Sequence, residues 1–189
     1  VLNDRKTIIA FFSMIIFLIY KTVFNAFWPV LMTKGLGFTS HELGWFPAVR
    51  SAIILAAYFL LLPRLQGKGY KTPLLIAFSC LSVSVIGLIV SPERSFLVII
   101  GVMMIEGVGL AVANPYLQAL MAASVPPEER ARILAWVNVF IIVITSPFGW
   151  ISGSLSEINK TYPFILLAFF LIAAVVIMAL KKPLHSQKS

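Results

Sequence analysis

Three ionisable side chains stand inside long apolar segments of this sequence, and packing alone explains them poorly. Lys21, Arg50 and Glu106 are each flanked on both sides by hydrophobic runs. Translocon-based scales give a cost of about 2.5 to 3.5 kcal/mol for one such charge at the centre of a membrane helix. A carboxylate at mid-depth cannot reach the surface as a lysine or arginine can, so Glu106 must be paired, protonated or hydrated. We therefore expect Glu106 to bind a proton or a cation.

Position along the segments indicates a partner for this carboxylate. At 1.5 Å per residue, Glu106 lies roughly 15 Å and Lys21 roughly 16 Å from the same membrane surface, on helices that run in opposite directions. The shared depth predicts a Lys21–Glu106 ion pair, with anion binding as the other role open to Lys21. Arg50 is expected nearer that surface, in the outer third of its segment, where it can also snorkel outward.

Other polar side chains share segments with these three charges. Asn25 and Trp28 follow Lys21 at helical spacing, which places all three on one helix face. Pro115 follows Asn114 and leaves a backbone carbonyl free where the helix can bend. Interhelical packing is the alternative role for such residues. The predicted lining of a solute cavity comprises Tyr20, Asn25, Trp28, Arg50, Tyr58, Asn114, Gln118, Asn138 and Thr145.

The elements that position these residues are almost entirely apolar. Of the 189 residues, 60% are hydrophobic and 12% are charged, whereas an ordinary soluble protein carries about 25% charged residues. A soluble single domain is excluded, because it could not cover its surface with polar groups. Six apolar segments are long enough to span a bilayer, each bounded by Pro, Gly, Ser or charge: 7–32, 43–62, 72–90, 96–122, 133–155 and 162–180. The sequence therefore predicts an all-α membrane protein with one six-helix bundle over residues 1–189.

Basic residues are distributed unequally between the two sets of loops. One set, which includes both chain ends, holds ten Lys and Arg residues, and the other holds three. Because basic loops stay on the cytoplasmic side, we expect both ends in the cytoplasm and a multi-pass protein of the plasma or inner membrane. The net charge of +8 is then a topology signal and not a sign of nucleic-acid binding. The single cysteine excludes a disulfide framework and a cysteine-based metal site.

Polar side chains divide the six segments into two groups. The sixth segment has no polar side chain from Phe164 to Leu180, and the third has only Cys80 and serines that can bond back to their own helix. The first, second, fourth and fifth segments carry the charged and amide residues. We expect these four helices to surround a polar space, and the third and sixth to lie outside and face lipid.

This pattern resembles the carboxy-terminal half of a major facilitator superfamily transporter, helices seven to twelve of twelve, over nearly the whole chain. Residues 125–138, VPPEERARILAWVN, are similar to the family's loop between helices ten and eleven, where Pro-Glu-Glu-Arg-x-Arg is frequent. Residues 63–71, PRLQGKGYK, are similar to its Gly/Asp-Arg-x-Gly-Arg-Arg loop between helices eight and nine. Gly69 and Lys71 match that pattern, but Gln66 stands where the Asp would be.

The resemblance implies two inverted three-helix repeats, with helices seven, eight, ten and eleven around the cavity. It also implies an amino-terminal six-helix half as partner, and the first residue, Val1, likewise suggests a piece of a longer protein. The expected function is alternating-access transport of a small solute, with the proton as the candidate coupling ion at Glu106 and Lys21. The loop residues expected to anchor or gate are Gly69, Lys71, Glu128, Glu129, Arg130 and Arg132.

Two other classes of function are weighed against transport. A non-transporting sensor or assembly scaffold would use the Lys21–Glu106 pair as a static contact. A membrane-embedded enzyme is poorly supported, because the two histidines, His41 and His185, fall in loops on opposite sides. The sequence has no catalytic dyad, Walker loop or metal-ligand cluster, so we expect no enzymatic activity, cofactor or metal.

Overall fold

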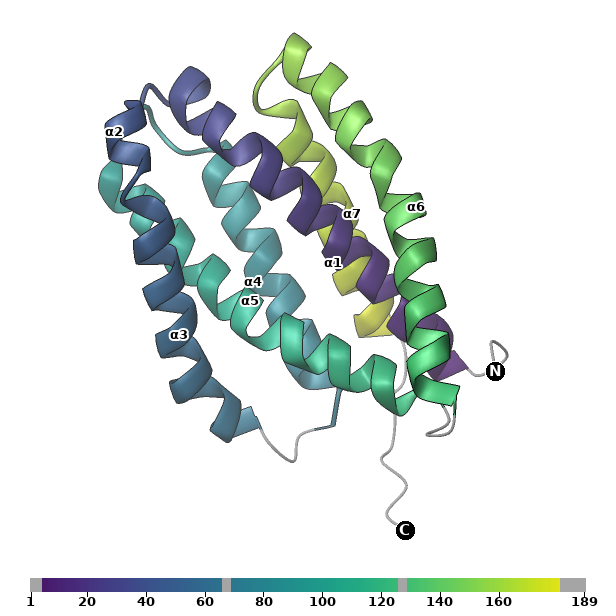
Figure 1. The fold of residues 1–189 in the computed structure, drawn as a ribbon. Helices are drawn as coiled ribbons and strands as arrows, with labels where there is room; N and C mark the ends of the chain where they lie inside the picture. Colours follow the sequence, from purple (N-terminus) through teal and green to yellow (C-terminus); the bar gives the residue numbers. More distant parts are fainter. Residues whose placement is uncertain (1–4, 66–68, 126–128, 181–189) are drawn as a thin grey trace.

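The computed structural model describes residues 5–65, 69–125 and 129–180, and its secondary structure in these ranges is helical. The elements are α1 (Arg5–Val30), the π-helical turn η1 (Leu31–Gly35), α2 (Ser40–Leu43), α3 (Phe46–Leu65), α4 (Lys71–Ile89), α5 (Phe96–Ala123), α6 (Arg130–Ile158) and α7 (Tyr162–Leu180) (Figure 1). Six stretches built on the long helices are long and apolar enough to cross a membrane. The prediction of an all-α, six-span protein is confirmed.

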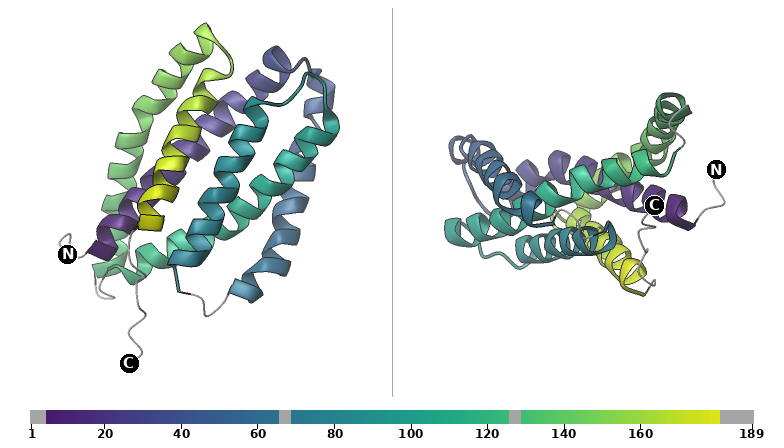
Figure 2. Two further views of the ribbon diagram at one scale, coloured as in Figure 1. Left: turned by 180° about the vertical axis from the view of Figure 1, so that it is seen from behind. Right: turned by 90° about the horizontal axis from the view of Figure 1, so that it is seen from below.

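The long helices form layers. Seen along the bundle, α3 and α6 lie on one face, α4 and α7 lie on the opposite face, and α1 and α5 run between them (Figure 2). The middle helix of each predicted repeat contacts the first helix of the other, since α3 packs on α5 and α6 packs on α1. The third helices, α4 and α7, contact each other. This exchange of contacts is the pattern expected of two three-helix repeats related by a pseudo-two-fold axis.

The helices α4 and α7 are the third and sixth predicted spans. They lie at the back of the view in Figure 1 and present apolar side chains outward, such as Ile165, Phe169 and Ile172 of α7. Their inner faces are densely packed, and Phe78 and Leu81 of α4 are fully buried. They are therefore a packed layer of the six-helix unit as well as its apolar outer surface.

Two glycines let α5 approach its neighbours closely. A Cβ atom added at Gly109 would lie 2.8 Å from Leu81 Cγ of α4 and 3.1 Å from the carbonyl oxygen of Ala77. At Gly107 it would lie 2.5 Å from Ile53 Cγ2 of α3. Because Glu106 precedes Gly107, the approach of α3 to α5 is fixed next to the buried carboxylate.

The end of the bundle that carries α2, called the α2 end below, is tied together by polar contacts. Thr39 and Glu42 form a capping box at the start of α2. Arg94 adopts a positive φ of 53° and donates its backbone N–H to the carbonyl oxygen of Leu36 at 3.0 Å. The start of α1 and the end of α7 lie at the opposite end, called the terminal end below (Figure 1).

Candidate functional site

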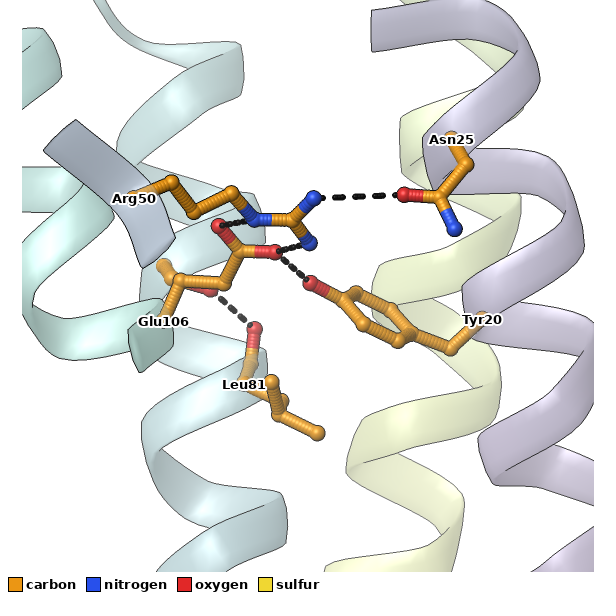
Figure 3. Close-up of polar contacts among 6 residues, drawn as sticks. Tyr20, Asn25, Arg50, Leu81 and Glu106 are labelled. Carbon is orange, nitrogen blue, oxygen red and sulfur yellow. Dashed lines mark hydrogen bonds and ion pairs between the residues drawn. The ribbon is translucent and has the colours of Figure 1, made fainter. Parts of the chain in front are cut away.

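The most buried charge described in the structure is the carboxylate of Glu106, whose side chain is 1% exposed. Arg50 of α3 reaches it with two nitrogens, Nη2 at 2.6 Å from Oε1 and Nε at 3.1 Å from Oε2 (Figure 3). Tyr20 of α1 donates its hydroxyl to Oε1 at 2.5 Å. Paired, charge-assisted hydrogen bonds of this kind are strong and fix the geometry of both groups. The carboxylate thus joins α1, α3 and α5.

Arg50 has further partners on α1. Its Nη1 donates to Asn25 Oδ1 at 3.2 Å (Figure 3). Its guanidinium carbon lies 5.1 Å from the ring centroid of Phe24, within the range of a cation–π interaction. The Arg50 side chain keeps 25% of its surface exposed, although each of its three guanidinium nitrogens has a hydrogen-bond partner. The ion pair therefore joins a buried acid, Glu106, to a partly exposed cation, Arg50.

The predicted Lys21–Glu106 ion pair is wrong. Arg50 occupies the carboxylate, whereas the Lys21 Nζ lies 5.9 Å from the ring centroid of Phe17 on its own helix. The different depths expected for Arg50 and Glu106 were counted at about 1.5 Å per residue along helices taken to run straight across the membrane and parallel to one another. In the structure α5 crosses the bundle obliquely (Figure 1), so counting residues along the helices misjudged the depth, and the long arginine side chain spans what remains.

Two hollows flank the Arg50–Asn25 hydrogen bond, and both residues line both hollows. The larger, of about 280 Å³, lies on the side of the terminal end of the bundle. It is lined by Phe17, Lys21, Asn25, Arg50, Ile54, Tyr58, Leu110 and Asn114. The smaller, of about 190 Å³, lies toward the α2 end and includes Trp28. Six of the predicted polar residues thus meet in one region between α1, α3 and α5.

The remaining predicted lining residues lie elsewhere. Tyr20 is buried behind the hollows against Glu106. Gln118 is exposed and donates to Asn114 at 3.4 Å. Thr145 of α6 is buried and donates to the carbonyl oxygen of Ile142 on its own helix, and Asn138 is exposed. Neither hollow includes a residue of α6, so the predicted contribution of that helix is not seen at these two hollows.

Sequence reasoning missed the apolar part of the lining. Phe17 lies one helical turn before Lys21, and Phe24 lies one turn after Tyr20, so both share a face with polar residues that were selected. Helical spacing could have found these two aromatic residues. Ile54 and Leu110 give no such signal, because apolar residues surround them in the sequence.

Those of the predicted loop residues that the structure describes lie at the terminal end. Gly69 has a φ of 21° and is exposed. Lys71 donates to the carbonyl oxygen of Ala179 at 3.4 Å, which links the start of α4 to the end of α7. Arg132 and Glu129 form an exposed ion pair at 3.0 Å. Glu128 and the side chain of Arg130 lie outside the described part of the chain.

No group of three or more His, Cys, Asp and Glu side chains in the described ranges is placed to hold a metal ion. The site is instead a buried carboxylate, its arginine and two hollows inside a six-helix membrane bundle, the architecture of a carrier that handles solutes within the bilayer. The model of the Major Facilitator Superfamily matches residues 10–189. The chain belongs to this family, and the assignment makes the protein a membrane transporter of small solutes. No curated protein and no solved structure gave a match to the chain.

Proposed function

We propose that this chain is one six-helix half of a secondary transporter that binds a small solute between α1, α3 and α5 and alternates access to it. The observation that carries the proposal is the Arg50–Glu106 contact, because its arginine lines both hollows. Because Arg50 lines both hollows, a change of its hydrogen-bond partners is suited to open one hollow and close the other.

Glu106 is the coupling group in this proposal. Its charge is matched by Arg50 and supported by Tyr20 while α3 stays in place. Movement of α3 would withdraw the cation. An isolated ionised carboxylate in an apolar interior is costly, so the group would take a proton instead. Proton binding at Glu106 and the position of α3 are then linked.

A second six-helix half is the proposed partner. The face that carries α3 and α6 exposes large apolar side chains, among them Phe59 of α3 and Trp136, Phe140 and Val143 of α6. Contact with the amino-terminal half would cover this face and close the hollows on that side.

Following the distribution of basic residues, the terminal end faces the cytoplasm of a plasma or inner membrane. There Lys71, Glu129 and Arg132 would anchor the loops.

The coupling role is tested by Glu106→Gln in the full-length protein. Proteoliposomes with a trapped pH indicator are given small carboxylates, amines and sugars, and the signal of protein-free liposomes is subtracted. We expect solute-dependent proton movement in the wild type and its loss in Glu106→Gln, because the amide cannot exchange a proton. Glu157→Gln, at an exposed glutamate of α6, is the control and should behave as the wild type. Equal proton movement in Glu106→Gln and the wild type would remove Glu106 from the mechanism.

A further inference from the structure

Charge is distributed unevenly around the larger hollow. Its lining includes two cationic side chains, Lys21 and Arg50, and no carboxylate. Glu106, which pairs with Arg50, is 1% exposed and is covered by Arg50 and Tyr20. A solute in this hollow therefore meets positive charge and amide groups without meeting the acid of the site.

From this arrangement we propose that the larger hollow binds a small organic anion, with a single carboxylate placed between Lys21 and Arg50, both of which line it. The inference rests on the proposed transport function and assigns the class of solute. A cationic solute would face two like charges. A zwitterion would find no carboxylate in the lining to pair with its ammonium group.

Lys21 is the group that favours an anion most strongly. No carboxylate of the described ranges lies within ion-pair distance of it, and its contact with the ring of Phe17 is long, at 5.9 Å. A cation inside a membrane protein is costly unless it is paired. Because Glu106 neutralises Arg50, the positive charge in excess at this hollow is that of Lys21. A bound carboxylate would neutralise this charge.

The remaining lining residues limit the rest of the solute. Asn25, Tyr58 and Asn114 supply hydrogen-bonding groups, whereas Phe17, Ile54 and Leu110 supply an apolar and aromatic wall. A volume of about 280 Å³ is near the lower end of the range for small-molecule sites. The lining fits a compact monocarboxylate with an apolar or aromatic body.

Three probes of similar shape and different charge test this assignment: benzoate, its neutral counterpart benzamide and its cationic counterpart benzamidine. Binding to the purified full-length protein is measured as concentration-dependent thermal stabilisation. We expect benzoate to stabilise the wild type and the two other probes to do so at least about tenfold more weakly. Lys21→Met should weaken benzoate binding by about tenfold or more, and Lys21→Arg should retain most of it. Lys34→Met, at an exposed lysine of η1, should leave benzoate binding unchanged.

Several results would overturn the assignment. Stronger binding of benzamidine or benzamide than of benzoate would exclude an anion site. Absence of benzoate binding, or equal binding by Lys21→Met and the wild type, would remove the larger hollow from anion recognition. None of these results would affect the proton-movement assay of Glu106→Gln, so a failure of the solute assignment is distinguishable from a failure of the transport proposal.

Discussion

Replacing Arg50 with methionine is expected to destabilise the full-length protein by about 3 kcal/mol, because it leaves a buried carboxylate without its cation. Glu106 is 1% exposed and accepts three hydrogen bonds, two of them from Arg50. Methionine preserves much of the volume of the arginine stem and supplies no donor. The measurement is the thermal midpoint of the purified protein, compared with a wild-type sample in the same detergent.

The double variant Arg50→Met/Glu106→Met separates stability from function. We expect the double variant to regain most of the stability lost in Arg50→Met, since neither charge is left unpaired. It should show no proton-coupled flux, because the coupling carboxylate has been removed. The matched control is Arg94→Met, because Arg94 pairs with Glu42 in an exposed contact at 3.4 Å. Its effect on stability should be within about 1 kcal/mol. Full flux in the double variant would show that the pair is a static contact with no part in coupling.

The second large effect is expected for Gly107→Leu. A Cβ atom at this position would lie 2.5 Å from Ile53 Cγ2 and 3.6 Å from the backbone nitrogen of Ile54, so a leucine must push α3 away from α5. Overpacking of this kind costs about 1 to 3 kcal/mol. Because Arg50 lies one turn from Ile53 on α3, the displacement also weakens its contact with Glu106. Both the thermal midpoint and the flux should fall.

Gly101→Leu provides the control on the same helix. A Cβ atom at Gly101 would meet nothing within 4 Å, so this variant should keep the stability and flux of the wild type. If Gly107→Leu behaved like Gly101→Leu, the close approach of α3 to α5 would not be needed to position the ion pair.

The six spans could be predicted because long apolar runs are local signals. The segment predicted over residues 96–122 is α5, Phe96–Ala123. The second segment shows where such signals fail, since α3 begins at Phe46 and not at residue 43. The preceding residues form α2 with its own capping box at Thr39, and Pro47 suits the first turn of a new helix. The capping box of α2 and the proline of α3 are local features near this boundary that hydropathy does not register.

The candidate site was only partly accessible to sequence reasoning. Apolar context identified Glu106, Lys21 and Arg50 as exceptional, and helical spacing grouped Asn25 with Lys21. Which cation reaches Glu106 depends on the tilt of α5 and on side-chain length. Neither quantity can be read from residue counts along straight helices. The burial of Tyr20 against the carboxylate has the same origin, because it requires α1 and α5 to cross at that residue.

Proton uptake that accompanies benzoate binding would show directly that the bound solute and the proton on Glu106 are coupled. We propose in addition that a carboxylate bound beside Lys21 draws Arg50 away from Glu106, which then takes a proton because an isolated ionised carboxylate is costly there. Titration of the full-length protein with benzoate at neutral pH, in weak buffer with a pH indicator, should show uptake of about one proton per benzoate bound. Glu106→Gln should bind benzoate without proton uptake. Equal uptake in both proteins, or none in the wild type, would exclude coupling through Glu106.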